Sequence, residues 1–239
     1  MESGFFDRIE LLMGAGAMAR LAAARVLVFG TGGVGSWCCE ALVRSGIGHV
    51  TIVDPDVVCP SNVNRQLMAT SSTVGRPKVE VMKERLLEIN PSLDIAARQE
   101  RFCEENAGDF DMDSYDYIVD AIDSLKDKAA LILRACASRA IFISSMGAAL
   151  KLDPTRVRVG EFWEVRGCPL GAALRKRFRQ RKTLPAKDFL CVYDDEVLPM
   201  RGAREPESRT NGSVVSITAI FGFTIAGLIL KDFYPETDA

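Results

Sequence analysis

The chain has 239 residues, of which 48% are hydrophobic, and a formal net charge of -2. This length is sufficient for a large α/β domain with a buried core, and the near-neutral charge gives no global sign of a polyanion-binding protein. The seven cysteines form no CxxC pair, so we expect no zinc site and reduced, cytoplasmic thiols. The first residues lack the features of a signal peptide, which also favours the cytoplasm.

Apolar runs alternate with helical patterns along most of the chain, as is typical of an α/β protein with a mostly parallel sheet. This alternation predicts a Rossmann-like, doubly wound sheet with helices on both faces, in a single domain that spans residues 1–239. In chain order, the expected elements are helix 7–23, strand 26–29, helix 34–46, strand 50–53, helix 77–89, strand 94–99, strand 116–121, helix 126–138, strand 140–144, strand 156–161, helix 169–182 and helix 214–231.

The later part of the chain departs from this regular pattern. Between residues 167 and 209 the periodicity weakens, while prolines and basic residues accumulate. This segment is expected to be a loop-rich insertion on the substrate side of the domain. The apolar stretch 214–230 is short for a membrane span and has no second span to support it. We therefore expect a helix packed on the sheet and no membrane partner.

A glycine-rich segment joins the first expected strand to the second expected helix. Glycines in this position let the backbone approach a phosphate at a helix N-terminus. Asp54 ends the next strand, where a carboxylate usually binds ribose hydroxyls. These features alone fit a nicotinamide or flavin dehydrogenase equally well. The candidate nucleotide-binding residues in this part of the chain are Gly30, Gly32, Gly33, Gly35, Ser36 and Asp54.

Two cations favour a triphosphate over a dinucleotide. Arg65 follows the second strand and Lys78 begins the third expected helix, so both are expected at the ligand-binding edge of the sheet. The pyrophosphate of a dinucleotide is usually bound by backbone amides, whereas a triphosphate is bound by Arg, Lys and a metal ion. The alternative is that each is an ordinary surface cation.

Asp123 lies between the strand over 116–121 and the next helix, a position suited to a Mg²⁺ ion that keeps several of its waters. Its alternative role is the N-cap of the helix from Lys126. His49, the only histidine, precedes the second strand and lies away from the expected ligand edge. An alcohol dehydrogenase often needs a positioned proton donor, so the place of this histidine disfavours that function.

These motifs, in this order and spacing, resemble the ubiquitin-activating-enzyme-like (ThiF/MoeB-type) adenylation superfamily. The resemblance implies that ATP, with Mg²⁺ on Asp123, activates a carboxylate as an acyl adenylate. It also implies a homodimer, because Arg8 resembles the N-terminal arginine that members lend to the ATP site of the partner subunit. The matching motifs are Gly-x-Gly-Gly-x-Gly-Ser from Gly30, Asp54, Asn62-x-x-Arg65-Gln66, Gly-x-Pro-Lys78 and Asp-Ala-Ile-Asp123-Ser.

Within this superfamily, the chain most resembles the tRNA threonylcarbamoyladenosine dehydratases. This resemblance implies ATP-dependent dehydration (cyclisation) of the modified adenosine next to the tRNA anticodon, through adenylation of its threonyl carboxylate and release of pyrophosphate and AMP. The basic stretch from Arg175 to Lys187 fits an anticodon stem-loop partner, and a solvated basic helix is the alternative. The segments that carry the resemblance are 44–48, 144–148, 151–155, 169–177 and 191–196.

Other functions share the same ATP-site residues. The protein could adenylate the C-terminal carboxylate of a ubiquitin-like or sulfur-carrier protein, which would make a carrier or sulfur-relay protein its partner. A non-catalytic nucleotide-binding module is a third interpretation. Cys168 and Cys191 could carry an acyl group or sulfur, although buried, inert thiols are the commoner case.

Overall fold

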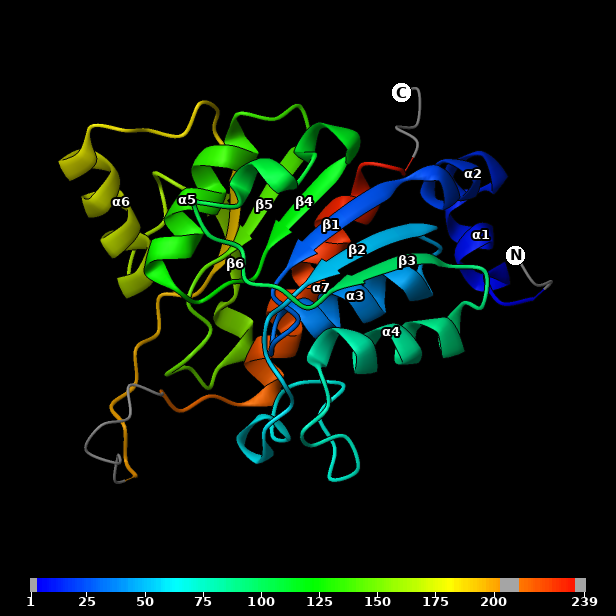
Figure 1. Ribbon diagram of the computed structural model, residues 1–239, viewed down its shortest axis with the longest axis horizontal. Helices are drawn as coiled ribbons and strands as arrows, with labels where there is room; N and C mark the ends of the chain where they lie inside the picture. Colours follow the sequence, from blue (N-terminus) through cyan, green and yellow to red (C-terminus); the bar gives the residue numbers. More distant parts are fainter. Residues whose placement is uncertain (1–3, 203–210, 235–239) are drawn as a thin grey trace.

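The computed structural model describes residues 4–202 and 211–234, and its centre is a seven-stranded sheet with helices on both faces (Figure 1). The strand order is β3-β2-β1-β4-β5-β7-β6, in which only the β6–β7 pair is antiparallel. The predicted doubly wound α/β fold is confirmed. The strands are β1 (Arg25–Phe29), β2 (His49–Val53), β3 (Asp94–Arg98), β4 (Tyr117–Asp120), β5 (Ile141–Ser145), β6 (Arg158–Glu161) and β7 (Leu190–Tyr193).

The α-helices lie close to the ranges that the sequence predicts, with one exception. The expected helix over 7–23 is divided at Gly14, whose backbone (φ 80°, ψ 156°) leaves the helical region. The α-helices are α1 (Asp7–Met13), α2 (Ala15–Ala23), α3 (Gly35–Arg44), α4 (Lys78–Ile89), α5 (Leu125–Cys136), α6 (Pro169–Arg181) and α7 (Val215–Lys231).

Two apolar cores form, one on each face of the sheet. On one face α2, α3, α4 and α7 pack against the central strands, and on the other face α5 and α6 do so. Helix α7 lies directly against α3 at Gly222, where a Cβ atom would come within 2.5 Å of the carbonyl oxygen of Val34. The last helix therefore supports the start of α3, immediately after the glycine-rich segment.

The segment 167–209 contributes more than loops. It holds the expected helix α6 and also β7, a strand that the sequence analysis did not predict and that lies between β5 and β6. The sequence analysis missed β7 because it lies in the segment where the apolar periodicity weakens and prolines and basic residues accumulate. The late segment is thus built into the sheet itself.

The apolar stretch at 214–230 is α7, which buries one side against the sheet and α3, as predicted. Within residues 4–202 and 211–234, no helix has both the length and the apolar character that crossing a bilayer would require.

Candidate active site

A cavity of about 850 Å³ opens at the carboxyl ends of the parallel strands. It lies where β1 has β2 on one side and β4 on the other, which is the point where ligands bind in doubly wound sheets. Its volume is in the range of small-molecule sites. Nine of the candidate residues line it, namely Gly30, Gly32, Gly33, Asp54, Asn62, Arg65, Gln66, Lys78 and Asp123.

The glycine-rich loop is shaped by close backbone contacts. Gly30 has a φ of 88°, and a Cβ atom there would lie 2.7 Å from the carbonyl oxygen of Ala121. At Gly35 a Cβ atom would lie 1.8 Å from the carbonyl oxygen of Gly30. Glycine is therefore required at both positions for the loop to turn into α3, whereas Gly32 and Gly33 face the cavity.

Three candidate residues, Gly35, Ser36 and Arg8, do not line the cavity of their own chain. Ser36 is fully buried, and its hydroxyl donates to the carbonyl oxygen of Gly32 (2.6 Å) and accepts from the amide of Leu67 (3.2 Å). Ser36 thereby ties the glycine-rich loop to the segment that carries Arg65 and Gln66.

Asp54 is held at the end of β2 by backbone donors. One carboxylate oxygen accepts from the amide of Thr31 at 2.7 Å, and the other accepts from the amide of Asp56 at 2.9 Å. The side chain is buried, yet it reaches the cavity. Because each carboxylate oxygen can accept more than one hydrogen bond, Asp54 can still bind ribose hydroxyls.

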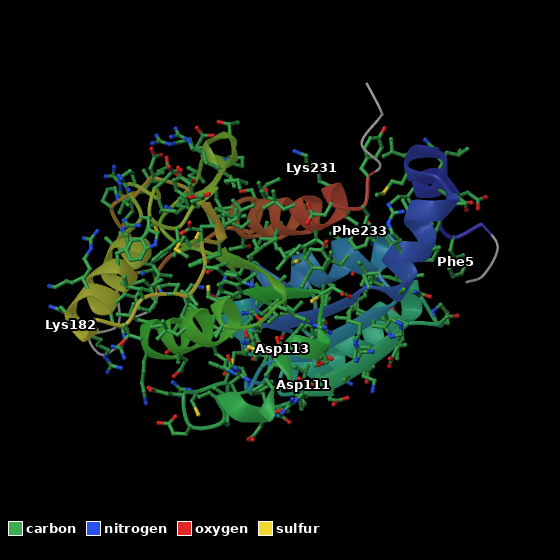
Figure 2. The ribbon with its side chains drawn as sticks, turned by 90° about the horizontal axis from the view of Figure 1, so that it is seen from above. Phe5, Asp111, Asp113, Lys182, Lys231 and Phe233 are labelled. Carbon is green, nitrogen blue, oxygen red and sulfur yellow. The ribbon has the colours of Figure 1, made fainter. Side chains whose placement is uncertain are left out.

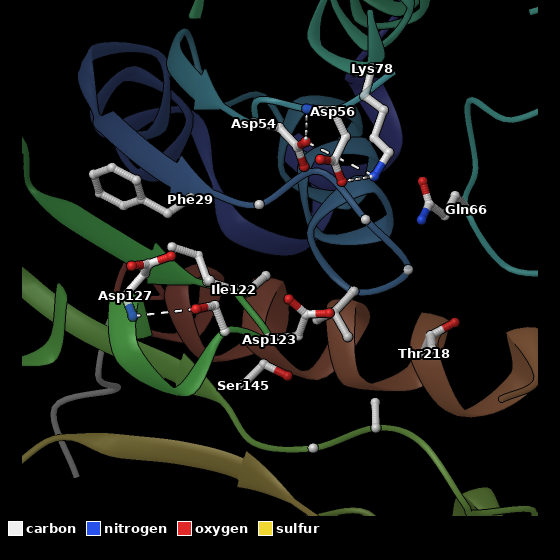
Figure 3. Close-up of a pocket in the computed structure, with 18 of the residues that line it drawn as sticks. Phe29, Asp54, Asp56, Gln66, Lys78, Ile122, Asp123, Asp127, Ser145 and Thr218 are labelled. Carbon is white, nitrogen blue, oxygen red and sulfur yellow. Dashed lines mark hydrogen bonds and ion pairs between the residues drawn. The ribbon is translucent and has the colours of Figure 1, made fainter. Parts of the chain in front are cut away.

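Lys78, the first residue of α4, has its ammonium group in the cavity wall (Figure 3). Its Nζ lies 2.7 Å from Asp56 Oδ2 and 4.0 Å from Asp54 Oδ1. Two carboxylates therefore neutralise this buried cation, and a bound phosphate would compete with the exposed side chain of Asp56 for it.

Arg65 is a cation with no acidic partner among the described residues. Its Nη1 donates to the carbonyl oxygen of Ser61 (2.8 Å) and to the side-chain oxygen of Asn64 (3.0 Å). These neutral acceptors orient the guanidinium group without cancelling its charge. The site thus holds a positive charge available to an anion.

Two amide side chains complete this wall. Asn62 Oδ1 accepts from the amide of Cys59 (2.9 Å) and so fixes the turn before Arg65. Gln66 is buried beside the glycine-rich loop, and its Oε1 has no hydrogen-bond partner among residues 4–202 and 211–234. An unpaired buried polar atom is costly in a folded protein, so this wall is suited to a polar ligand or water.

Asp123 lies on the opposite wall from Lys78 (Figure 3). The structure shows that the N-cap of α5 is Ser124, whose hydroxyl accepts from the amide of Asp127 at 3.5 Å, so the N-cap alternative for Asp123 is wrong. In the described parts of the chain, no three His, Cys, Asp or Glu residues form a metal-binding group. A single carboxylate nevertheless suits Mg²⁺, which takes its other ligands from phosphates and water.

The other end of the cavity is apolar and is suited to a nucleobase. Phe29, Val53 and Phe102 line it, next to an ion pair between Arg101 and Asp127. Arg101 Nε and Nη2 donate to the same Asp127 oxygen at 2.8 and 2.5 Å. The sequence analysis missed this pair, because it joins residues on separate elements and belongs to no motif.

A third wall comes from the segment after β5. Gly147, Ala148 and Ala149 line the cavity, and the next residue, Leu150, has a positive φ of 61°. The Leu150 amide donates to the carbonyl oxygen of Gly212 (2.9 Å), and its own carbonyl oxygen accepts from the amide of Leu198 (2.8 Å). This unusual conformation joins three loops at the rim of the cavity.

A buried lysine and a partly exposed glutamate hold the same wall in place. The Lys151 ammonium is buried and donates to the carbonyl oxygens of Asp194 (2.9 Å) and Glu196. The Glu196 carboxylate accepts from the amides of Leu152 (2.5 Å) and Asp153 (3.2 Å). Sequence resemblance pointed to these segments, but only the structure shows that they contact each other.

The basic stretch around α6 is divided between structure and surface. Arg175 donates to the carbonyl oxygen of Phe162 (3.0 Å), and burial lowers the pKa of its guanidinium group. Lys187 donates to the carbonyl oxygens of Ser138 (2.8 Å) and Ala140 (2.5 Å). Four cations are exposed, namely Lys176, Arg179, Arg181 and Lys182, the last of which lies at the outer tip of α6 (Figure 2).

The structure also answers questions about individual side chains outside the cavity. Phe178 and Phe189 are buried in the core, which excludes them from base stacking in this conformation. Cys168 and Cys191 are buried too, and burial raises the pKa of the Cys191 thiol far above its usual range. A protonated, buried thiol is a poor nucleophile. Arg8 is exposed on α1 and does not line the cavity of its own chain.

Comparisons with known proteins agree with this geometry. The tRNA threonylcarbamoyladenosine dehydratase of Haemophilus influenzae is 41% identical over 91% of this chain and 88% of its own length, and that of Escherichia coli is 34% identical over 95% and 92%. The crystal structure of the E. coli enzyme in complex with ATP superposes with a TM-score of 0.86 at 35% identity, covering 95% of this chain and 93% of that one. The ThiF family profile matches residues 6–233, so the chain belongs to the ThiF family.

Proposed function

We propose that this protein is an ATP-dependent dehydratase that cyclises threonylcarbamoyladenosine next to the anticodon of tRNA. The observation that carries the proposal is the meeting of Arg65, Lys78 and Asp123 around one cavity that is also lined by Asp54, the candidate for binding the ribose. Relatives that carry this activity in their names match nearly the whole chain. This favours the dehydratase over an enzyme that adenylates a carrier protein.

The first step needs no general base. A free carboxylate of this kind has a pKa of about 3.5–4, so it is already ionised at neutral pH. One carboxylate oxygen attacks the α-phosphorus of ATP, and pyrophosphate leaves. The protein must therefore align the two groups and bind the charge that develops on the leaving pyrophosphate.

The residues around the cavity are suited to these tasks. Arg65 and Lys78 would bind the phosphates, while the amides of Gly32 and Gly33 approach them from the glycine-rich loop. A Mg²⁺ ion on Asp123 would neutralise further phosphate charge when it is bound. Asn62 and Gln66 would keep the segment that carries Arg65 in position, and Phe29 and Phe102 would enclose the base.

In the second step the ureido group of the substrate attacks the activated acyl carbon, and AMP leaves with one carboxylate oxygen. A ring closes, the ureido group loses a proton, and the overall change in the nucleoside is the loss of one water. Both steps take place in the same cavity, between the ATP-binding wall and the wall formed by Gly147, Ala148 and Ala149.

We further propose a homodimer in which Arg8 reaches the ATP site of the partner subunit. The exposed position of Arg8 on α1 supports it, as do two exposed leucines on the same helix, Leu11 (84%) and Leu12 (69%). Exposed apolar side chains of this size often mark a protein interface. Replacing Arg8 with Ala should slow pyrophosphate release, and mixing it with an Arg65→Ala subunit should restore part of the activity. Mixed subunits with no restored activity would exclude a shared site.

For the tRNA we propose an interface along α6, through the exposed side chains of Lys176, Arg179, Arg181 and Lys182. Side chains of this kind bind phosphates and do not read sequence. Replacing Arg181 and Lys182 with Glu should weaken RNA binding and reduce the slope of log K against log salt by roughly 1 for each phosphate that is no longer bound. The control is Lys231→Glu, on α7. An unchanged salt dependence would place the RNA elsewhere.

The deciding experiment measures pyrophosphate and AMP release from Mg-ATP, with and without tRNA that carries the threonylcarbamoyl group, followed by mass analysis of the nucleosides. Release that depends on the modified tRNA, with loss of one water from the nucleoside, is the expected result. Release that depends instead on the C-terminal carboxylate of a carrier protein would favour the adenylating alternative and a sulfur-relay partner.

We also propose a cytoplasmic location. The seven cysteines are all free, and free thiols are typical of a reducing compartment.

A further inference from the structure

Among the described residues, Asp120 and Lys128 form the only ion pair in which both side chains are completely buried. Lys128 Nζ lies 2.8 Å from Asp120 Oδ2. Asp120 ends β4 and Lys128 lies in the first turns of α5, so the pair spans the loop that contains Asp123. Neither residue lines the cavity.

Two further hydrogen bonds of the pair go to this loop. Lys128 Nζ donates to the carbonyl oxygen of Ile122 (3.0 Å), and Asp120 Oδ1 accepts from the amide of Ile122 (3.1 Å). Both backbone polar groups of the residue before Asp123 are therefore bound by the ion pair. Ser144, from the neighbouring strand β5, donates its hydroxyl proton to Asp120 Oδ2 at 2.7 Å.

A buried ion pair contributes little net stability to a fold, so stability alone does not explain why Asp120 and Lys128 are paired here. Removing two charges from water costs several kcal/mol for each ion, and an apolar pair of similar size often stabilises a fold as well or better. The ion pair instead fixes the position of the backbone before Asp123, because its hydrogen bonds hold both the N–H and the carbonyl oxygen of Ile122. The same loop contacts the glycine-rich segment, since the carbonyl oxygen of Ala121 faces Gly30.

We propose that Asp120 and Lys128 are positioning residues that fix the Asp123 carboxylate for the Mg²⁺ ion of Mg-ATP. This inference rests on the proposed function, in which Asp123 binds that ion. Partners behind a metal-binding residue commonly change metal affinity or activity by about 10- to 100-fold when they are replaced. The pair thus acts on the nucleotide site through the backbone, from outside the cavity.

The test is the Mg²⁺ dependence of nucleotide binding, measured by calorimetry with α,β-methylene-ATP in excess Mg²⁺ and in EDTA. The variant is Asp120→Asn with Lys128→Met, which removes both charges together and leaves no unpaired buried ion. We expect its Kd in Mg²⁺ to rise about 10- to 100-fold, with the Kd in EDTA unchanged. Combining it with Asp123→Asn should cause no additional weakening, because all three residues act through one ion.

The matched control is Glu40→Gln, because Glu40 is also buried and paired with cations, Arg44 and Arg85, but belongs to α3 and does not line the cavity. It should lower thermal stability and leave the Mg²⁺-dependent part of binding intact. Ser144→Ala keeps both charges of the pair, so it should fold and show a smaller decrease in affinity in the same direction.

Two outcomes would contradict the inference, and they can be told apart. If Asp123→Asn loses the Mg²⁺-dependent affinity while the double variant and Ser144→Ala keep it, the positioning role is wrong and the proposed site stands. If Asp123→Asn itself keeps that affinity, the metal-binding role of Asp123 is wrong and the inference fails with it.

Discussion

The two sides of the cavity are built in different ways. On the nucleotide side, residues 25–128 place short motifs at the ends of consecutive parallel strands, so each motif reaches the cavity through local structure. On the other side, which we propose as the substrate side, segments around residues 147–153, 194–198 and 211–213 are joined by a positive-φ residue, Leu150, and by the buried Lys151. The first side depends on local sequence and the second on long-range contacts.

The largest effect is expected from the nucleotide side. Arg65→Ala should lower the rate of pyrophosphate release by about 10²–10³-fold, because it removes a preorganised cation from the reacting phosphates. Its hydrogen bonds to Ser61 and Asn64 are local, so the thermal midpoint should change little. The control is Arg76→Ala, an exposed arginine nearby that pairs with Glu84 outside the cavity. Equal rates of pyrophosphate release for the two variants would show that Arg65 has no catalytic role.

A smaller effect should come from α7, which supports the nucleotide side from behind. In Gly222→Ala, the new methyl group would meet Val34 O at 2.5 Å and Cys38 N at 2.8 Å. These are backbone atoms, so α7 must move away from α3, at a cost of about 1–3 kcal/mol in the free energy of unfolding. The affinity for ATP should fall as well.

Gly227→Ala, on the same helix, is the matched control for this change. Its Cβ atom would meet nothing within 4 Å, so better helix propensity should stabilise the protein by about 0.5–1 kcal/mol. If chemical denaturation showed that both substitutions change the free energy of unfolding in the same direction, the close contact between α7 and α3 would be refuted.

On the substrate side, Glu196→Gln should loosen the loop that contains Leu152 and Asp153. The removal of the charge weakens two hydrogen bonds by roughly 1 kcal/mol in total. We expect the KM for modified tRNA to rise severalfold while the Kd for α,β-methylene-ATP stays constant. Asp153→Asn is the comparison, because that carboxylate bonds only within its own turn, to Thr155. A change in ATP affinity for Glu196→Gln would show that the two sides are not independent.

The smallest effect concerns the thiols. Cys191→Ala should keep the dehydration rate within about twofold, because burial raises the pKa of this thiol and disfavours the thiolate. In the native protein iodoacetamide should modify exposed Cys59 first and Cys191 only after unfolding. A large decrease in activity, or early labelling of Cys191, would favour a mechanism in which this thiol carries an acyl group or sulfur.

The sequence was sufficient to bring the predicted nucleotide-binding motifs to one cavity, because strand, turn and helix follow one another within about thirty residues in such units. Asp54, Lys78 and Asp123 line that cavity, as their positions at element ends predicted. His49 was expected before the second strand and is instead the first residue of β2, at the amino end of the strand and outside the cavity lining. Periodicity could not reveal β7, which lies in the segment rich in prolines and basic residues, or the break at Gly14. The contacts of Leu150 depend on segments that no local pattern brings together.

The place of α7 has a consequence for how the protein is made. On the ribosome, the glycine-rich loop and Asp123 emerge long before residues 215–231, and α7 supplies both the surface beside Gly33, at Thr218, and the contact at Gly222. A nascent chain therefore carries every phosphate-binding motif before the support for those motifs has been synthesised. Because chains emerge from the N-terminus onward, the packing of α7 against α3 at Gly222 is completed last.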